Sequence, residues 1–269
     1  FPDGFEWTTE SRPELLTKEV GEKLKTAFGK HGLVIGKDII LGIGWGLESS
    51  NPLIVQGAMG KKVTVPNEET VALMREYGLS STAHTLFKPP FLTESESVED
   101  VVNTVRHASE KNLYELMIVM TMNKRPSTAV DELSNMGMYK LPSIWSVAEI
   151  MNRLGSEICS KTQFFGFSVG SKQAETVTPK DEEEKQLMEL ILAFGGLKKE
   201  WEEIVDFLNN AQGKNKKEWE ELMKNKPNSS LQERIAAGLD MLGKQSVGKG
   251  FKELSVEVHE RQERLKAKK

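Results

Sequence analysis

The residues best suited to covalent catalysis form the run Gly166-Phe167-Ser168-Val169-Gly170. This run fits the G-x-S-x-G pattern of a nucleophile elbow, in which the glycines allow a sharp strand-to-helix turn that exposes the serine hydroxyl. An acid and a histidine follow in the chain, as Asp206 or Asp240 and then His259. The order of these residues allows serine hydrolysis with Ser168 as the nucleophile and His259 as its base.

The sequence around this motif gives the elbow little support. Residues 171–178 form a weak helix pattern and Pro179 follows at once, while the alternating strands and helices of a doubly wound sheet are not evident. Asp206 and His259 lie in segments with ordinary amphipathic helix patterns. We therefore interpret 166–170 as a glycine-containing turn in the core and keep the serine hydrolase as the alternative.

Patterns that bind phosphate or metal fail on their spacing. The segment 57–62 resembles a phosphate-binding loop, but the first glycine would have to be Val55, and Lys62 stands where Ser or Thr would hold magnesium. The four histidines have no paired spacing suited to zinc. The single cysteine, Cys159, lies beside the apolar side of a predicted helix. We expect no metal, no cofactor and a buried, inert thiol.

Local clusters of basic side chains are the evidence for binding a nucleic acid. The candidate contacts are Lys30, Lys37, Lys61, Lys62, Lys124 and Arg125. If folding brought several of them to one groove, they would neutralise phosphates without reading a base sequence. The formal net charge of -4 excludes a global cationic field, so the hypothesis requires that RNA binds in a defined groove of the protein and not indiscriminately.

The composition is that of a globular protein. Of 269 residues, 38% are hydrophobic and 28% are charged, which suffices for one large domain or two modest ones. The sequence has no run of about 18 apolar residues, so we predict no transmembrane helix. One cysteine excludes an internal disulfide and suits the cytoplasm or another reducing intracellular compartment. The first residues show no signal-peptide pattern, although the absence of an initiator Met leaves a removed targeting segment open.

The element that must organise the others is the apolar stripe from Ser97 to Met122. Its apolar residues recur at three- and four-residue steps, which predicts one central helix. Thr93 and Glu96 form a capping box before it, and Pro126 follows its end. We expect shorter helices to pack around this helix, beginning with one that opens at Ser11.

Glycine-rich and charged segments flank the central helix. Between residues 32 and 65, glycines alternate with short Val- and Ile-rich runs, which predicts strands or an extended ribbon. Beyond it, the run at 198–203 recurs almost unchanged at 216–221. We interpret this near-repeat as two helices that each bury a tryptophan while Lys and Glu face water.

These patterns predict a mainly α, multi-helix globular protein with a small extended or β-ribbon region near residues 32–65. We divide it into 1–170, a helical domain with a glycine-rich extended insertion, and 171–269, a charged C-terminal helical domain. Methionines between 117 and 138 could form an adaptable apolar surface. We expect a non-enzymatic assembly or binding protein that acts as a homo-oligomer or with a protein partner and coats or binds RNA.

Overall fold

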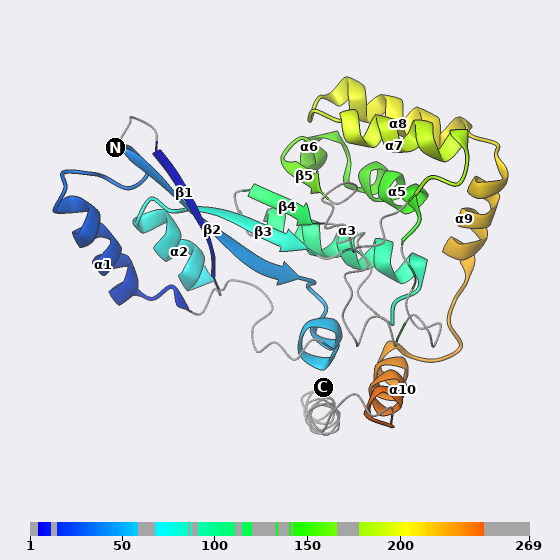
Figure 1. Cartoon of the computed structure of the whole chain (residues 1–269), viewed down its shortest axis with the longest axis horizontal. Coiled ribbons are helices and arrows are strands. Elements are labelled where there is room, and N and C mark those ends of the chain that lie inside the picture. Colours follow the sequence, from blue (N-terminus) through cyan, green and yellow to red (C-terminus); the bar gives the residue numbers. More distant parts are fainter. Residues whose placement is uncertain are drawn as a thin grey trace.

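A computed structural model describes residues 5–11, 15–58, 68–85, 87, 91–110, 115–119, 133, 140, 142–165 and 178–244 (Figure 1). The strands are β1 (Phe5–Ser11), β2 (Ile39–Glu48), β3 (Ser80–Thr85), β4 (Glu115–Val119) and β5 (Thr162–Phe165). The helices are α1 (Lys18–Gly29), the π-helix η2 (Leu53–Ala58), α2 (Glu68–Glu76), α3 (Glu94–Glu110), α5 (Ile144–Leu154), α6 (Ser156–Cys159), α7 (Glu182–Ala193), α8 (Lys198–Asn210), α9 (Lys214–Lys224) and α10 (Leu231–Lys244). The expectation of a mainly helical protein is confirmed.

The strands form one parallel sheet in which their spatial order follows the chain, β1-β2-β3-β4-β5. Helices lie in the crossovers between successive strands, as parallel pairing requires. All strands therefore end at the same side of the sheet, called the carboxyl edge below. The inference that strands and helices do not alternate is wrong, because the sequence patterns did not predict strands at β1, β3 and β4.

The extended region predicted at 32–65 contains β2, the strand between β1 and β3. Alternate residues Ile39, Leu41 and Ile43 are buried. They join a small apolar cluster with residues of α2 and the segment that follows it, including Tyr77. Gly36 and Gly78 approach each other beside this cluster with positive φ angles of 80° and 67°. A side chain at either position would be strained, which accounts for glycine at both.

The predicted single helix from Ser97 to Met122 is wrong in its second half. Helix α3 ends at Glu110, and Glu115–Val119 forms strand β4, which pairs with β3 and β5. The uninterrupted apolar run Leu116–Val119 suits a strand inside a parallel sheet, and helical periodicity alone does not separate the two. The helix predicted at Ser11 is also misplaced. Ser11 ends β1, and α1 begins after Thr17, whose Oγ1 accepts a hydrogen bond from Val20 N.

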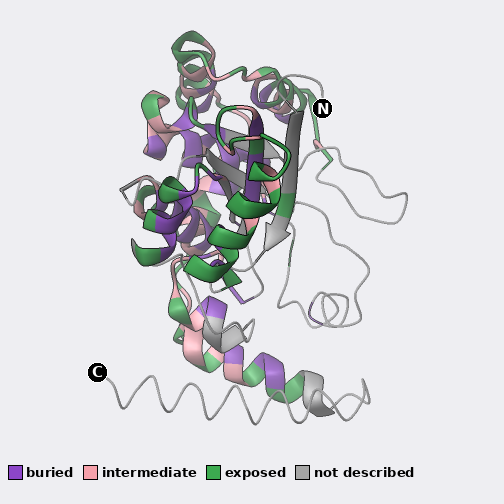
Figure 2. Ribbon diagram, turned by 90° about the vertical axis from the view of Figure 1, so that its left-hand side faces the viewer, coloured by how far each residue is buried: buried purple, intermediate pink, exposed green. Residues whose placement is uncertain are grey.

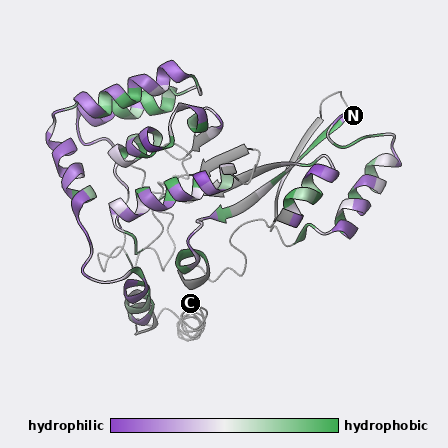
Figure 3. Cartoon of the chain, turned by 180° about the vertical axis from the view of Figure 1, so that it is seen from behind, coloured by the Kyte–Doolittle hydropathy of each residue, from purple (hydrophilic) through white to green (hydrophobic). Residues whose placement is uncertain are grey.

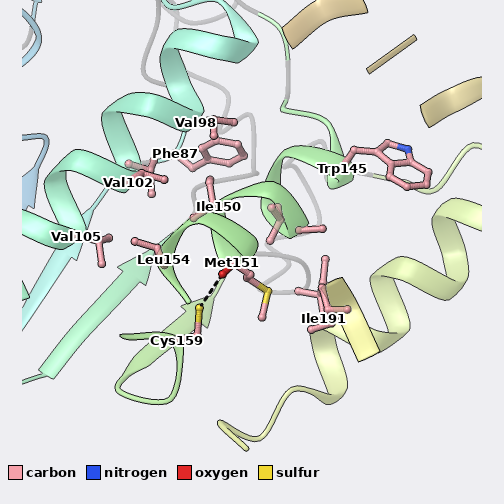
Figure 4. Packing of buried hydrophobic residues seen from close by; sticks show 14 of the residues in the cluster. Phe87, Val98, Val102, Val105, Trp145, Ile150, Met151, Leu154, Cys159 and Ile191 are labelled. Carbon is pink, nitrogen blue, oxygen red and sulfur yellow. Dashed lines mark hydrogen bonds between the residues drawn. The ribbon is translucent and has the colours of Figure 1, made fainter. Parts of the chain in front are cut away.

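The main core lies between α3, α5 and the C-terminal helices α7, α8 and α9. Its α3 side chains are those predicted for the central stripe: Val98, Val101, Val102, Val105 and Ala108. Figure 4 shows Val98, Val102 and Val105 on the side of Ile150 and Leu154 of α5, with Ile191 of α7 on the other side. Helix α5 is almost wholly buried, as the colouring by burial illustrates (Figure 2). Helix α5 therefore lies at the centre of the helical part.

The near-repeat of the C-terminal third attaches two successive helices to α5. Trp219 of α9 donates its indole N–H to Ser146 Oγ at 3.1 Å, and Trp201 of α8 donates to Met151 O at 2.9 Å. The Lys and Glu side chains between them form ion pairs along each helix, and α9 is hydrophilic over most of its length (Figure 3). The two predicted helices are present and Trp219 is buried, whereas Trp201 is only partly buried. The domain boundary at residue 171 stays a prediction, and helices on its C-terminal side share the core of α3 and α5.

Candidate functional site at the carboxyl edge

Polar side chains gather at the carboxyl edge, where parallel sheets usually bind their ligands. Strand β2 ends in Glu48, whose φ of 61° is in the left-handed region, and the register with β3 shifts at this point. The next residue, Ser49, is fully buried and donates its hydroxyl to Asp100 Oδ1 at 2.6 Å. The chain then turns, with Asn51 N donating to Ser49 Oγ at 2.9 Å. The end of β2 is thereby fixed to α3.

A second contact between the same two elements lies one helical turn further along α3. Thr104 Oγ1 accepts a hydrogen bond from Ser50 N at 2.8 Å and donates to Ser50 Oγ at 3.2 Å. Asp100 and Thr104 are four residues apart, so they lie on the same face of α3. Both are buried. The loop after β2 is thus held by two side chains of one helix face.

Two buried polar atoms at this edge have no hydrogen-bond partner among the described residues. They are Asp100 Oδ2 and the hydroxyl oxygen of Thr85, the last residue of β3. Thr85 is fully buried and pairs in register with Glu48 of β2. Glu48 directly precedes Ser49, the residue that donates to Asp100. One atom thus lies at the end of β3 and the other on α3, beside the end of β2. Buried polar atoms are nearly always hydrogen-bonded, so two such atoms without a partner among the described residues are typical of a place that receives a ligand or an ordered water.

The electrostatic environment of Asp100 suits proton transfer. Burial raises the pKa of its carboxyl from 3.8 to about 6, and the hydrogen bond from Ser49 offsets part of that rise. No basic side chain is recorded within ion-pair distance of this carboxylate in the described part of the chain. A carboxyl with a pKa near 6 can both accept and release a proton close to neutral pH, which is what a general acid–base group needs.

Buried hydrogen bonds also fix the neighbouring element ends. Glu94 at the start of α3 accepts from Ser143 N at 2.6 Å and from Ser146 Oγ at 2.7 Å, at the start of α5. Ser146 in turn accepts the indole N–H of Trp219. Glu94 and Ser146 are buried. This chain of hydrogen bonds connects α3, α5 and α9, and it holds the first turn of α3 in place.

Two of the predicted nucleic-acid contacts lie away from this edge. Lys30 follows the end of α1 and Lys37 precedes β2, so both belong to the opposite, amino edge of the sheet, where they are exposed. The other four predicted contacts, Lys61, Lys62, Lys124 and Arg125, lie outside the described residues. Their contact with a nucleic acid stays a prediction.

The residues of the hydrolase alternative are largely outside the described part of the chain. Ser168 and His259 both lie there, so their geometry stays untested. Strand β5 ends at Phe165, directly before the G-x-S-x-G run, so a strand of a parallel sheet does precede the motif. Asp206 is exposed on α8. The motif keeps its status as an alternative.

The cysteine behaves as expected. Cys159 is fully buried, and desolvation raises the pKa of its thiol to about 12. Its Sγ donates to Met151 O at 3.4 Å (Figure 4). A thiol with so high a pKa is unreactive at neutral pH.

Within the described residues, no group of three His, Cys, Asp or Glu side chains is placed to hold a metal. None of the described helices has the length and apolar character of a membrane span.

Sequence reasoning missed the buried cluster because its members look ordinary one by one. The signal was available in Ser49-Ser50-Asn51, a polar run that directly follows a glycine- and isoleucine-rich strand. Asp100, however, occupies a helix in which neighbouring positions carry acids on the exposed face. Only its contact with Ser49, 51 residues away, distinguishes it.

Comparison with known proteins gives two related sequences. The chain is 26% identical over 145 residues to archaeosine synthase subunit beta of Methanosarcina acetivorans, which covers 54% of this chain and 39% of that protein. It is also 26% identical over 149 residues to an uncharacterised protein of Methanocaldococcus jannaschii, covering 54% and 37%. The chain thus spans about two fifths of the length of these relatives. It matches none of the known protein-family profiles.

A solved structure gives only a weak likeness. The radical S-adenosylmethionine methyltransferase TsrM of Kitasatospora setae, solved with cobalamin and a 4Fe-4S cluster, aligns with a TM-score of 0.40 and 13% identity, covering 76% of this chain and 44% of that one.

These relationships correct the functional expectation drawn from the sequence. A non-enzymatic assembly protein that coats RNA is wrong, because the relative with a functional name is a subunit of an enzyme. The amphipathic stripes that suggested assembly with other chains are instead buried within this one, between α3, α5 and the C-terminal helices. The error arose because an apolar helix face looks the same whether it meets another chain or its own core.

Proposed function

We propose that this chain is part of an enzyme that makes archaeosine or carries out a related modification of a nucleoside in RNA. The observation that carries the proposal is the similarity, over 145 residues, to archaeosine synthase subunit beta. The proposal concerns the whole protein to which the chain belongs, because the chain corresponds to about two fifths of that relative.

We place substrate binding at the carboxyl edge, where Asp100 Oδ2 and Thr85 Oγ1 have no hydrogen-bond partner among the described residues. A nucleoside offers N–H and O–H donors that a carboxylate oxygen can accept. A carboxyl with a pKa of about 6 can also take a proton from such a group and return it. Asp100 is therefore the residue we assign as general acid or base, and Ser49 holds its other oxygen in place.

The name of the relative also supports a protein partner. A subunit beta works with at least one other subunit, and we extend this to the present protein. RNA is the second partner in the proposal, since it would carry the nucleoside. Its phosphates could be bound by basic side chains away from the carboxyl edge, including the exposed Lys30 and Lys37.

Deleting the gene and measuring the nucleosides of the RNA tests the proposal. RNA from the deletion strain of the source organism is digested to nucleosides and its archaeosine is quantified by liquid chromatography and mass spectrometry. We expect archaeosine, or one related modified nucleoside, to disappear and to return with the wild-type gene. An unchanged nucleoside profile after deletion contradicts the proposal.

Two variants then test the assignment of the site. Asp100→Asn keeps the shape of the side chain but cannot exchange a proton, so it should restore less than about a hundredth of the modified nucleoside at equal protein level. Glu99→Gln removes a carboxylate from the neighbouring, exposed position of the same helix and should restore it fully. Full restoration by Asp100→Asn would refute a role for Asp100 while leaving the function of the protein open to the deletion test.

A further inference from the structure

Helix α10 is attached to the molecule in a different way from the other C-terminal helices. Helices α7, α8 and α9 contribute residues to the main core, whereas no described residue of α10 belongs to either apolar cluster. Figures 1 and 2 show α10 at the end of the molecule opposite α7 and α8. It contacts η2, the helix that follows β2, and Phe91, which precedes α3. It therefore lies at the carboxyl edge and not in the helical core.

A single arginine makes most of the polar contacts between α10 and this edge. Arg234 Nη2 donates to both carboxylate oxygens of Glu96, at 2.7 and 2.6 Å, and its Nε donates to Phe91 O at 2.9 Å. Glu96 also accepts from the N–H and the hydroxyl of Thr93, at 2.9 and 3.1 Å, and so caps α3. We call the contacts of Arg234 with Glu96 and Phe91 the latch.

The backbone on the α3 side of the latch is strained. Phe91 has a φ of 79°, a left-handed conformation that bulky residues rarely adopt. Its ring packs against Gly238 of α10, where a Cβ would come within 2.3 Å of the ring. Such a conformation persists only where surrounding contacts hold it. Arg234 and Gly238 supply two of those contacts, so detachment of α10 would remove part of the support for this conformation.

The apolar contact that opposes release is small. On α10 the buried positions are Ile235, Gly238 and Leu239, which correspond to one face over about one turn. The connection to α9, residues 225–230, has no regular structure and contains Pro227. Among the described residues, the Arg234–Glu96 ion pair and this short apolar face attach α10 to the carboxyl edge. We expect such a helix to open more readily than helices that share a core, because local stability follows the amount of buried contact.

We propose that α10 is a latched strap over the carboxyl edge, which detaches as a unit when the Arg234–Glu96 pair opens and thereby uncovers η2. Its consequence, access of the nucleoside to Asp100, rests on the proposed function. The detachment itself does not, and it can be measured without any substrate.

Amide hydrogen exchange of the whole protein, read by mass spectrometry of peptides, tests the detachment. In the wild type we expect 231–244 to exchange through an opening separate from that of α7 and α8, at a rate at least about tenfold higher. Arg234→Ala should accelerate exchange in 231–244 and in 91–97 together, again by about tenfold or more, because a charge-assisted hydrogen-bond pair is lost. The exchange rate of the same peptides in Arg234→Lys should lie between the rates of the wild type and of Arg234→Ala.

Arg153→Ala is the matched control. Arg153 of α5 pairs with Glu99 of α3 and with Glu149 of its own helix, and both helices share the main core. It should leave exchange in α10 unchanged. Exchange of wild-type α10 in step with α7 and α8 would overturn the strap. So would an Arg234→Ala variant whose α10 and 91–97 peptides exchange as in the wild type.

Thiol labelling tests whether detachment uncovers η2. Val55 of η2 is fully buried, and the native Cys159 gives little background because its thiol is buried with a pKa of about 12. A Val55→Cys variant should react with a maleimide at least about tenfold faster when Arg234→Ala is added. Val147→Cys in α5 should not respond. Equal labelling of Val55→Cys with and without Arg234 would overturn the uncovering of η2.

The strap and the proposed function fail in different experiments. Loss of the modified nucleoside on gene deletion concerns the function alone. Exchange and labelling are measured on the purified protein and concern the strap alone.

Discussion

Replacing Asp100 by Asn should change the stability of the protein in a pH-dependent way. Burial raises the pKa of this carboxyl from its ordinary 3.8 to about 6, so between these values the folded state binds more protons than the unfolded state. The contribution of the protonated carboxyl to stability is therefore fully present below pH 3.8 and is lost as the pH rises through 6. One pKa unit corresponds to about 1.4 kcal/mol, which gives about 3 kcal/mol over the full range.

The Asn side chain has the same shape and no charge, so its own contribution does not depend on pH. Any cost of an unpaired amide is the same at every pH and cancels when two pH values are compared. We expect Asp100→Asn to become more stable relative to the wild type as the pH rises. The difference in the free energy of unfolding, variant minus wild type, should be about 2–3 kcal/mol larger at pH 8 than at pH 4. This corresponds to roughly 5–10 °C in Tm for a domain of this size.

Urea or thermal unfolding at pH 4, 5, 6, 7 and 8, followed by tryptophan fluorescence, measures this difference. Glu99→Gln, which changes an exposed acid one residue away, is the control and should give a difference that varies little with pH. If Asp100→Asn differs from the wild type by the same amount at pH 4 and pH 8, the carboxyl titrates near its ordinary pKa and the argument from burial is refuted. A stabilised variant that makes less modified nucleoside would identify Asp100 as a group retained for function at the expense of stability.

Three further predictions concern packing and the untested motif. Trp219→Phe should destabilise the protein by about 2 kcal/mol, because the buried Ser146 loses the hydrogen bond from the indole, whereas Trp201→Phe loses a partly exposed hydrogen bond and should cost about 1 kcal/mol. Urea unfolding of the two variants measures both values. A larger cost for Trp201→Phe than for Trp219→Phe would contradict this account. Gly238→Ala should increase amide hydrogen exchange in α10, because the added Cβ would meet the ring of Phe91. This effect should outweigh the preference of about 1 kcal/mol that alanine has for helices over glycine. A slower exchange in the variant would show that the ring is not packed against this position. Ser168→Ala should leave activity intact, and covalent labelling of the wild type by a fluorophosphonate that disappears in this variant would instead establish the nucleophile elbow.

Local sequence patterns determined those elements whose signals lie within a few residues. The capping box of Thr93 and Glu96 is present, with Glu96 N donating to Thr93 Oγ1 at 3.3 Å. The apolar stripe of α3 is buried from Val98 to Ala108, and each tryptophan of the near-repeat is directed at α5. These features follow from helix periodicity and capping, which depend on neighbours three or four residues apart.

The sheet and the candidate site depended on contacts between distant residues. Leu116–Val119 reads equally well as the end of a helix or as a buried strand, and only pairing with β3 and β5 decides for the strand. Asp100 resembles the solvated acids beside it until Ser49, 51 positions earlier, is brought against it. Its raised pKa is a property of that burial and not of the residue type. The sequence by itself therefore determined the helices and their buried faces, and the tertiary structure decided which polar residues became a site, because desolvation and hydrogen bonding across the fold are set only when distant segments meet.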